Sequence, residues 1–133
     1  MIRVQRRRSL LRRITSVVAV SFGVVTVLAG GRVLFGGADP GYVIFRPLLV
    51  FNAMMGVAYV IAGVAIWRDL RWSRSAAGMI LALNLAVLGA IGVLYATGGG
   101  VAADSLRAMA FRSAVWFVLW MGLRTLSSPP ARR

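Results

Sequence analysis

The sequence predicts an all-α integral membrane protein, folded as an up-down four-helix bundle with both termini in the cytoplasm. Three observations predict this fold. Apolar residues make up 59% of the chain and charged residues 14%, well below the roughly 25% of a soluble domain. Long uncharged stretches recur along the 133 residues, and several approach the ~20 residues that a helix needs to cross a bilayer. The arginines, finally, gather in alternate connecting segments.

The first three spans are predicted over residues 14–35, 47–67 and 75–97, where charged residues are almost absent. Pro47 suits the first position of a helix and disfavours helical geometry in the residue before it. The second helix is therefore expected to begin at Pro47. A run of three glycines, Gly98 to Gly100, follows the third span and predicts its end.

Small residues at a spacing of four follow one face of the third span. Helices in lipid associate through close contact of small residues, because lipid offers them no hydrophobic reason to associate. This stripe therefore predicts that the third helix is central and tightly packed. The residues of the stripe are Gly78, Ala82, Ala86 and Ala90.

A fourth span is predicted over residues 105–126, and it differs from the others because it contains Arg107 and Arg112. One arginine at mid-membrane costs roughly 2.5–3.5 kcal/mol on insertion scales. The apolar residues that follow Arg112 offset one such cost, and packing against other helices offsets the rest. The alternative is an interfacial or re-entrant segment.

The charges predict the orientation of the bundle. The N-terminal stretch, the loop between the second and third spans and the C-terminal tail are rich in arginine, whereas the other two loops carry Asp39 and Asp104 and no base. The positive-inside rule then places both termini in the cytoplasm. Most of the net charge of +13 is thereby assigned to topology and anionic lipid, and no nucleic-acid partner is predicted. The predicted partners are the lipid bilayer and either a second copy in a homodimer or a larger membrane complex.

Residue types that are missing exclude several kinds of chemistry. The chain contains no cysteine and no histidine, which excludes disulfide and thiol redox chemistry and the common zinc and haem sites. The aspartates all fall in predicted loops, so no carboxylate within the membrane is available for proton-coupled export. The methionines are scattered over three spans and predict no metal site. These absences favour a non-enzymatic protein without a cofactor.

Polar residues within the spans are the candidate functional residues, because they are expensive in lipid. We expect them to form an outward-opening pocket for an anionic or carbonyl-bearing ligand such as a lipid headgroup, a quinone or a small anion. The alternative is structural: the arginines reach the outer headgroups or pair with Asp39 or Asp104, and the asparagines join helices through amide hydrogen bonds. The candidate ligand-binding residues are Arg46, Arg112, Asn52, Asn84 and Tyr59.

The stretch from Gly56 to Gly98, about a third of the chain, has a glycine-rich second span (GVAYVIAGVAIW), a short turn with arginines and a small-residue third span. It resembles the DoxX-like group of small four-helix bacterial membrane proteins. The resemblance implies a bacterial inner-membrane location and an accessory role near quinone-linked redox chemistry, and it transfers no catalytic residue. The predicted function is that of an accessory or partner-binding subunit of a membrane complex. The alternatives are a small anion or solute transporter or channel, and a quinone- or lipid-binding redox accessory.

Overall fold

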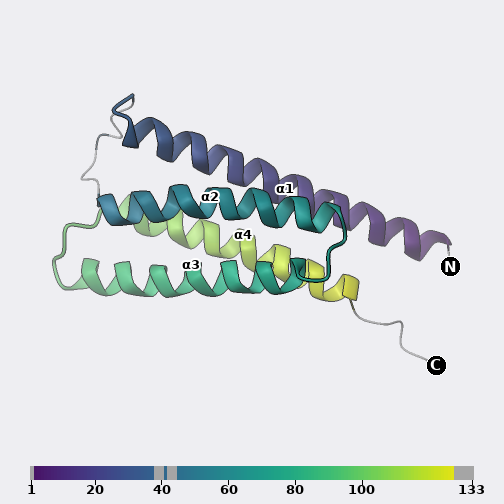
Figure 1. Ribbon diagram of the computed structural model, residues 1–133. Helices are drawn as coiled ribbons and strands as arrows, with labels where there is room; N and C mark the ends of the chain where they lie inside the picture. The colour runs from purple at the N-terminus through teal and green to yellow at the C-terminus, as the bar shows by residue number, and fades with distance from the viewer. Residues whose placement is uncertain (1, 38–40, 42–44, 128–133) are drawn as a thin grey trace.

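The computed structural model is an up-down bundle of four α-helices, which confirms the predicted fold class (Figure 1). The structure describes residues 2–37, 41 and 45–127, and this part of the chain contains no strand. All four helices are long and apolar enough to cross a membrane. Their bounds are α1 Ile2–Leu34, α2 Arg46–Trp67, α3 Ser73–Ala96 and α4 Ala103–Ser127.

The outer surface of the bundle is apolar on every helix. In water such continuous exposure of large apolar side chains would be unfavourable, and in a bilayer the same side chains contact lipid. The chain is therefore a multi-pass membrane protein. Examples from α1 to α4 are Val25, Leu28, Val57, Ile61, Leu83, Leu85, Phe117 and Val118.

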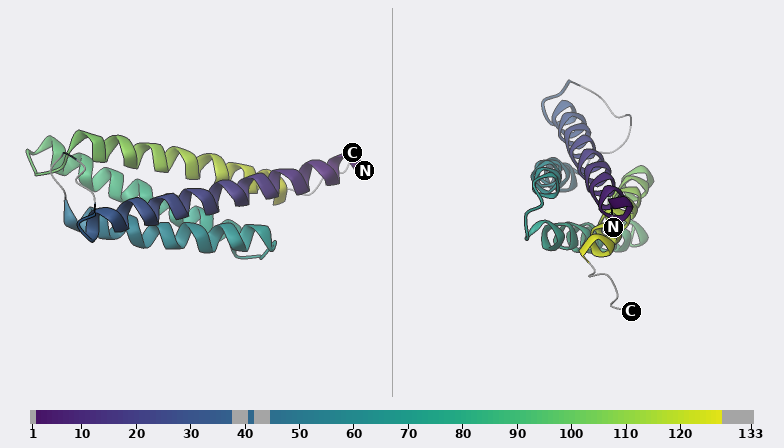
Figure 2. Two further views of the ribbon diagram at one scale, coloured as in Figure 1. Left: turned by 90° about the horizontal axis from the view of Figure 1, so that it is seen from above. Right: turned by 90° about the vertical axis from the view of Figure 1, so that its right-hand side faces the viewer.

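All four helices begin earlier than the spans predicted from the sequence: α2 by one residue, at Arg46 rather than Pro47, and α3 and α4 by two residues each. α1 begins at Ile2 rather than near residue 14, because arginine is a good helix former and the arginine-rich stretch contains no glycine or proline. This extension carries α1 past the other helices, as the left view of Figure 2 shows. α4 begins at Ala103 and continues unbroken through Arg107 and Arg112. An unbroken helix of this length agrees with a full fourth span.

The closest packing in the bundle joins α1 to α2, where two helix backbones meet. A methyl group added to Gly23 would lie 2.7 Å from the carbonyl oxygen of Gly56, and Ser16 donates a hydrogen bond of 2.7 Å to the carbonyl of Gly63. The buried small residues of α1 repeat at spacings of three and four, which keeps them on one face. They are Ser16, Ala19, Gly23, Thr26 and Gly30.

The small-residue stripe of α3 is not buried, so the prediction of a central, tightly packed third helix is wrong. Only Gly78 approaches a neighbour closely, since a methyl group there would lie 3.1 Å from the indole nitrogen of Trp120 on α4. Ala82, Ala86 and Ala90 are exposed. Both α1 and α3 carry small residues at helical spacing, but it is α1 whose small residues pack against the backbone of a neighbouring helix, α2.

The turn between α2 and α3 is fixed by hydrogen bonds to the last turn of α2. The backbone N–H of Asp69 donates to the carbonyl of Ile66 (3.1 Å), and that of Leu70 donates to Ala65 (3.0 Å). This is the pattern of a Schellman motif. Asp69 occupies its left-handed position with φ +56°, which aspartate tolerates better than most residues. Its carboxylate pairs with Arg12 of α1 at 2.7 Å.

Candidate functional site

Four side chains, one from each helix, form a cluster in the middle of the bundle. Two of them are joined by a hydrogen bond, and the other two are aromatic rings that pack against this pair. Tyr59 of α2, Asn84 of α3 and Trp116 of α4 are each 0% exposed. The hydroxyl of Tyr59 donates a hydrogen bond of 2.9 Å to Oδ1 of Asn84. The ring centroid of Tyr59 lies 4.9 Å from that of Trp116 and 5.9 Å from that of Phe22 on α1. The hydrogen bond therefore lies within an aromatic enclosure.

Arg112 lies close to this cluster on α4. Its side chain is half-buried. It precedes Trp116 by four residues, so both side chains lie on neighbouring parts of one helix face. At 1.5 Å per residue, Arg112 is about 14 Å from the start of α4. A positive charge is thus held well inside the span.

Three buried polar atoms around the cluster have no hydrogen-bond partner among the described residues. They are Nδ2 of Asn84, Nε1 of Trp116 and Oδ1 of Asn52. Each such group costs roughly 1–3 kcal/mol when buried without a partner, and native structures retain few of them. Two of the three are N–H donors, on Asn84 and Trp116, and the third is the amide oxygen of Asn52.

The structure brings some of the predicted site residues together and separates one. Tyr59 and Asn84 are in direct contact, and Arg112 lies one helical turn before Trp116, whose ring packs against that of Tyr59. Asn52 is on the face of α2 that carries Tyr59, two turns closer to the start of the helix. Arg46 is the exposed first residue of α2, about 20 Å along the helix from Tyr59 at 1.5 Å per residue. A ligand-binding role for these residues stays a prediction.

The sequence did not single out the aromatic partners of the cluster. Trp116 could have been found, because it follows Arg112 by four residues in the helix that carries that charge. Phe22 gives no such signal, since it is one apolar residue among many in α1. The enclosure around Tyr59 depends on the rotation of four helices about their axes, which the sequence pattern does not specify.

The structural alternative for the arginines applies to Arg107. Its guanidinium lies 3.3 Å from the carboxylate of Asp104, as the sequence suggested for this pair, and both side chains are well exposed. An exposed ion pair of this kind contributes little to stability. Asp39 lies outside the described residues, so its pairing with Arg46 stays a prediction.

No protein-family model, curated protein or solved structure matches this sequence. The resemblance to the DoxX-like group therefore stays a prediction.

Proposed function

We propose that this chain is a non-enzymatic accessory or partner-binding subunit of a membrane complex, and that α3 carries its contact surface. The observation that supports this is the exposed stripe of Ala82, Ala86 and Ala90 on α3. The small residues of α1 are covered by α2, whereas those of α3 are left at the surface. Because small residues mark close helix contacts in lipid, a helix of a partner is expected to cover α3 as α2 covers α1.

Single-cysteine cross-linking tests this contact, because the chain has no cysteine of its own. We expect Ala86→Cys, labelled with a maleimide that carries a photoactivatable benzophenone, to give a cross-linked species of higher mass when native membranes are illuminated, because the photoproduct inserts into C–H bonds and needs no thiol on the partner. Ala114→Cys is the matched control. It replaces an exposed alanine of α4 at a similar depth, since the two positions lie about 15 and 17 Å from the same end of the bundle at 1.5 Å per residue.

The mass of the adduct distinguishes a second copy of this chain from a different membrane protein. Equal cross-linking from both positions would indicate random collision in the bilayer. That result, or the absence of an adduct from position 86, would contradict α3 as the contact surface.

A second candidate function is supported by the buried cluster around Tyr59. Its N–H donors on Asn84 and Trp116 lack partners among the described residues, and Arg112 adds a positive charge. This set suits binding or passage of a small anion, or binding of a quinone or lipid carbonyl; the quinone would agree with the resemblance to the DoxX-like group. This candidate requires Arg112, whereas partner binding through α3 does not.

We further propose a bacterial inner-membrane location, which the resemblance to the DoxX-like group implies, with both ends of the chain in the cytoplasm, which the arginine distribution supports. Cysteine labelling of intact cells with a membrane-impermeant maleimide tests the orientation. Thr97→Cys, at the exposed end of α3, is expected to react from outside. Thr125→Cys, in the exposed last turns of α4, is expected to react only after the membrane is permeabilised. The reverse pattern would overturn the orientation.

A further inference from the structure

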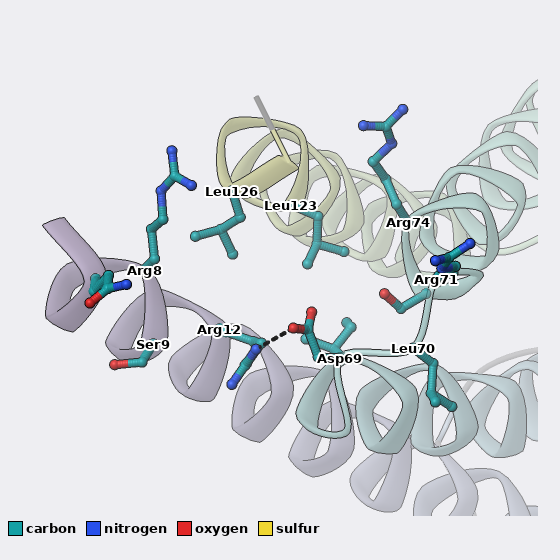
Figure 3. Close-up of a pocket in the computed structure, with 12 residues that line it drawn as sticks. Arg8, Ser9, Arg12, Asp69, Leu70, Arg71, Arg74, Leu123 and Leu126 are labelled. Atoms are coloured by element: carbon teal, nitrogen blue, oxygen red, sulfur yellow. Dashed lines mark ion pairs between the residues drawn. The ribbon is translucent and has the colours of Figure 1, made fainter. Parts of the chain in front are cut away.

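Three elements enclose a pocket of about 430 Å³ at the end of the bundle where α1 begins (Figure 3). The N-terminal part of α1 forms one wall, the turn between α2 and α3 forms the second, and the last turns of α4 form the third. The earlier start of α1 is essential to it, because the extension beyond the bundle supplies the first wall. The basic residues that line the pocket are Arg8, Arg12, Arg71 and Arg74.

The pocket is strongly positive. Asp69 is the one acidic residue among the described lining residues, and its carboxylate is engaged by Arg12 at 2.7 Å. Four positive charges and one negative charge leave a net charge of +3. Figure 3 shows Arg8 and Arg74 on opposite sides of the α4 wall, with both guanidinium groups extending to the same side, away from Asp69. Both residues thus lie at the edge of the pocket, one on either side of α4.

The α4 wall of the pocket is apolar, formed by Leu123 and Leu126 between the two arginines. The pocket also lies at a level that two tryptophans mark as the membrane interface. Trp67 and Trp72 flank the α2–α3 turn and are about half exposed, as is typical of tryptophans at the headgroup level. Arg13 lies over the Trp67 ring at 5.8 Å, a cation–π contact at this same level.

We propose that this pocket binds the headgroup of an anionic phospholipid, with the phosphate between Arg8 and Arg74 and the glycerol and upper acyl carbons against Leu123 and Leu126. The planar guanidinium fork matches phosphate oxygens well. A free phosphate would use only the charges, whereas a phospholipid uses the arginines and the leucines together. The proposal depends on the membrane location of the bundle and is independent of the α3 contact surface and of the buried cluster.

Lipid titration of the purified full-length protein, followed by native mass spectrometry, tests the proposal. Phosphatidylglycerol is compared with phosphatidylcholine of identical acyl chains. The variant Arg8→Gln/Arg74→Gln is expected to bind phosphatidylglycerol at least about tenfold more weakly, since each arginine near an anionic lipid contributes several-fold. The control variant Arg3→Gln/Arg7→Gln removes the same charge from exposed α1 positions that do not line the pocket. Its affinity is expected to stay within about twofold of the original.

Two further measurements distinguish lipid binding in the pocket from general electrostatic attraction of anionic lipid to the protein, and from binding of a free anion. Asp69→Asn is expected to strengthen phosphatidylglycerol binding, because it removes the opposing charge while asparagine still tolerates the left-handed backbone. Excess inorganic phosphate is expected to leave lipid binding unchanged. Equal losses in the two double variants, displacement of lipid by phosphate, or equal affinity for the two lipids would each overturn the proposal.

Discussion

Replacing Gly23 with alanine is expected to destabilise the whole bundle, by an amount at the upper end of the roughly 1–3 kcal/mol that overpacking costs. The added methyl group would lie 2.7 Å from the carbonyl oxygen of Gly56 and 2.8 Å from the backbone nitrogen of Val60. Both neighbours are backbone atoms, so no change of rotamer can remove the clash. α1 and α2 would have to separate along their closest contact. Thermal unfolding of the detergent-solubilised protein, followed by circular dichroism, measures the loss.

The matched control is Gly31→Ala in the same helix. A methyl group on Gly31 meets no atom within 4 Å. Alanine is the better helix former by about 0.5–1 kcal/mol, so this variant is expected to unfold at the same or a higher temperature. Replacement of glycine by alanine is thus expected to lower the stability of the bundle at position 23 and to maintain or raise it at position 31. If both variants lost stability equally, the close α1–α2 packing would be contradicted.

Replacing Arg112 with leucine is expected to make insertion of α4 more favourable by about 3–4 kcal/mol, the difference between arginine and leucine at a helix centre on insertion scales. The control is Arg107→Leu, because Arg107 is 82% exposed near the start of the helix and can reach the headgroups. Its effect is expected to be much smaller. Insertion of the α4 segment in a glycosylation-reporter assay measures both, and equal effects would mean that Arg112 also reaches the interface.

The same variant separates the two candidate functions. If the chain acts through α3, an Arg112→Leu protein that also carries Ala86→Cys should cross-link to its partner as before. If the cluster around Tyr59 holds a ligand, the Arg112→Leu protein should lose binding of that small anion, quinone or lipid carbonyl although it folds and inserts. Loss of function together with an unchanged cross-link would favour the buried-ligand candidate over the α3 contact as the basis of the activity.

The number of helices and their approximate positions were predictable from the sequence, because length and hydropathy along the chain are one-dimensional properties. Packing was not, because it depends on how each helix is rotated about its axis. The stripe at Ala86 and the buried glycine at Gly23 look alike in sequence, and only the fold shows that one is exposed and the other meets a backbone.

The candidate site shows the same division. Tyr59 and Asn84 were identified as polar residues within spans, and the structure shows that they are hydrogen-bonded to each other. The basic pocket was not anticipated, although the sequence placed its arginines at one end of the bundle. Its geometry depends on two features that the local sequence does not predict. One is the early start of α1. The other is the positive φ of Asp69, in a turn where the carboxylate of this residue lies beside Arg12.

The backbone contact between α1 and α2 also allows the first hairpin to form before the second is made. Its contacts lie entirely within the first half of the chain, so they are available while the ribosome is still making α3 and α4. Chains fold from the N-terminal side during synthesis, and a first hairpin held by its own interface can leave the insertion machinery as a finished unit. The second hairpin can then pack against the first as it inserts. Arg112 of α4 therefore need not be exposed to lipid on every side.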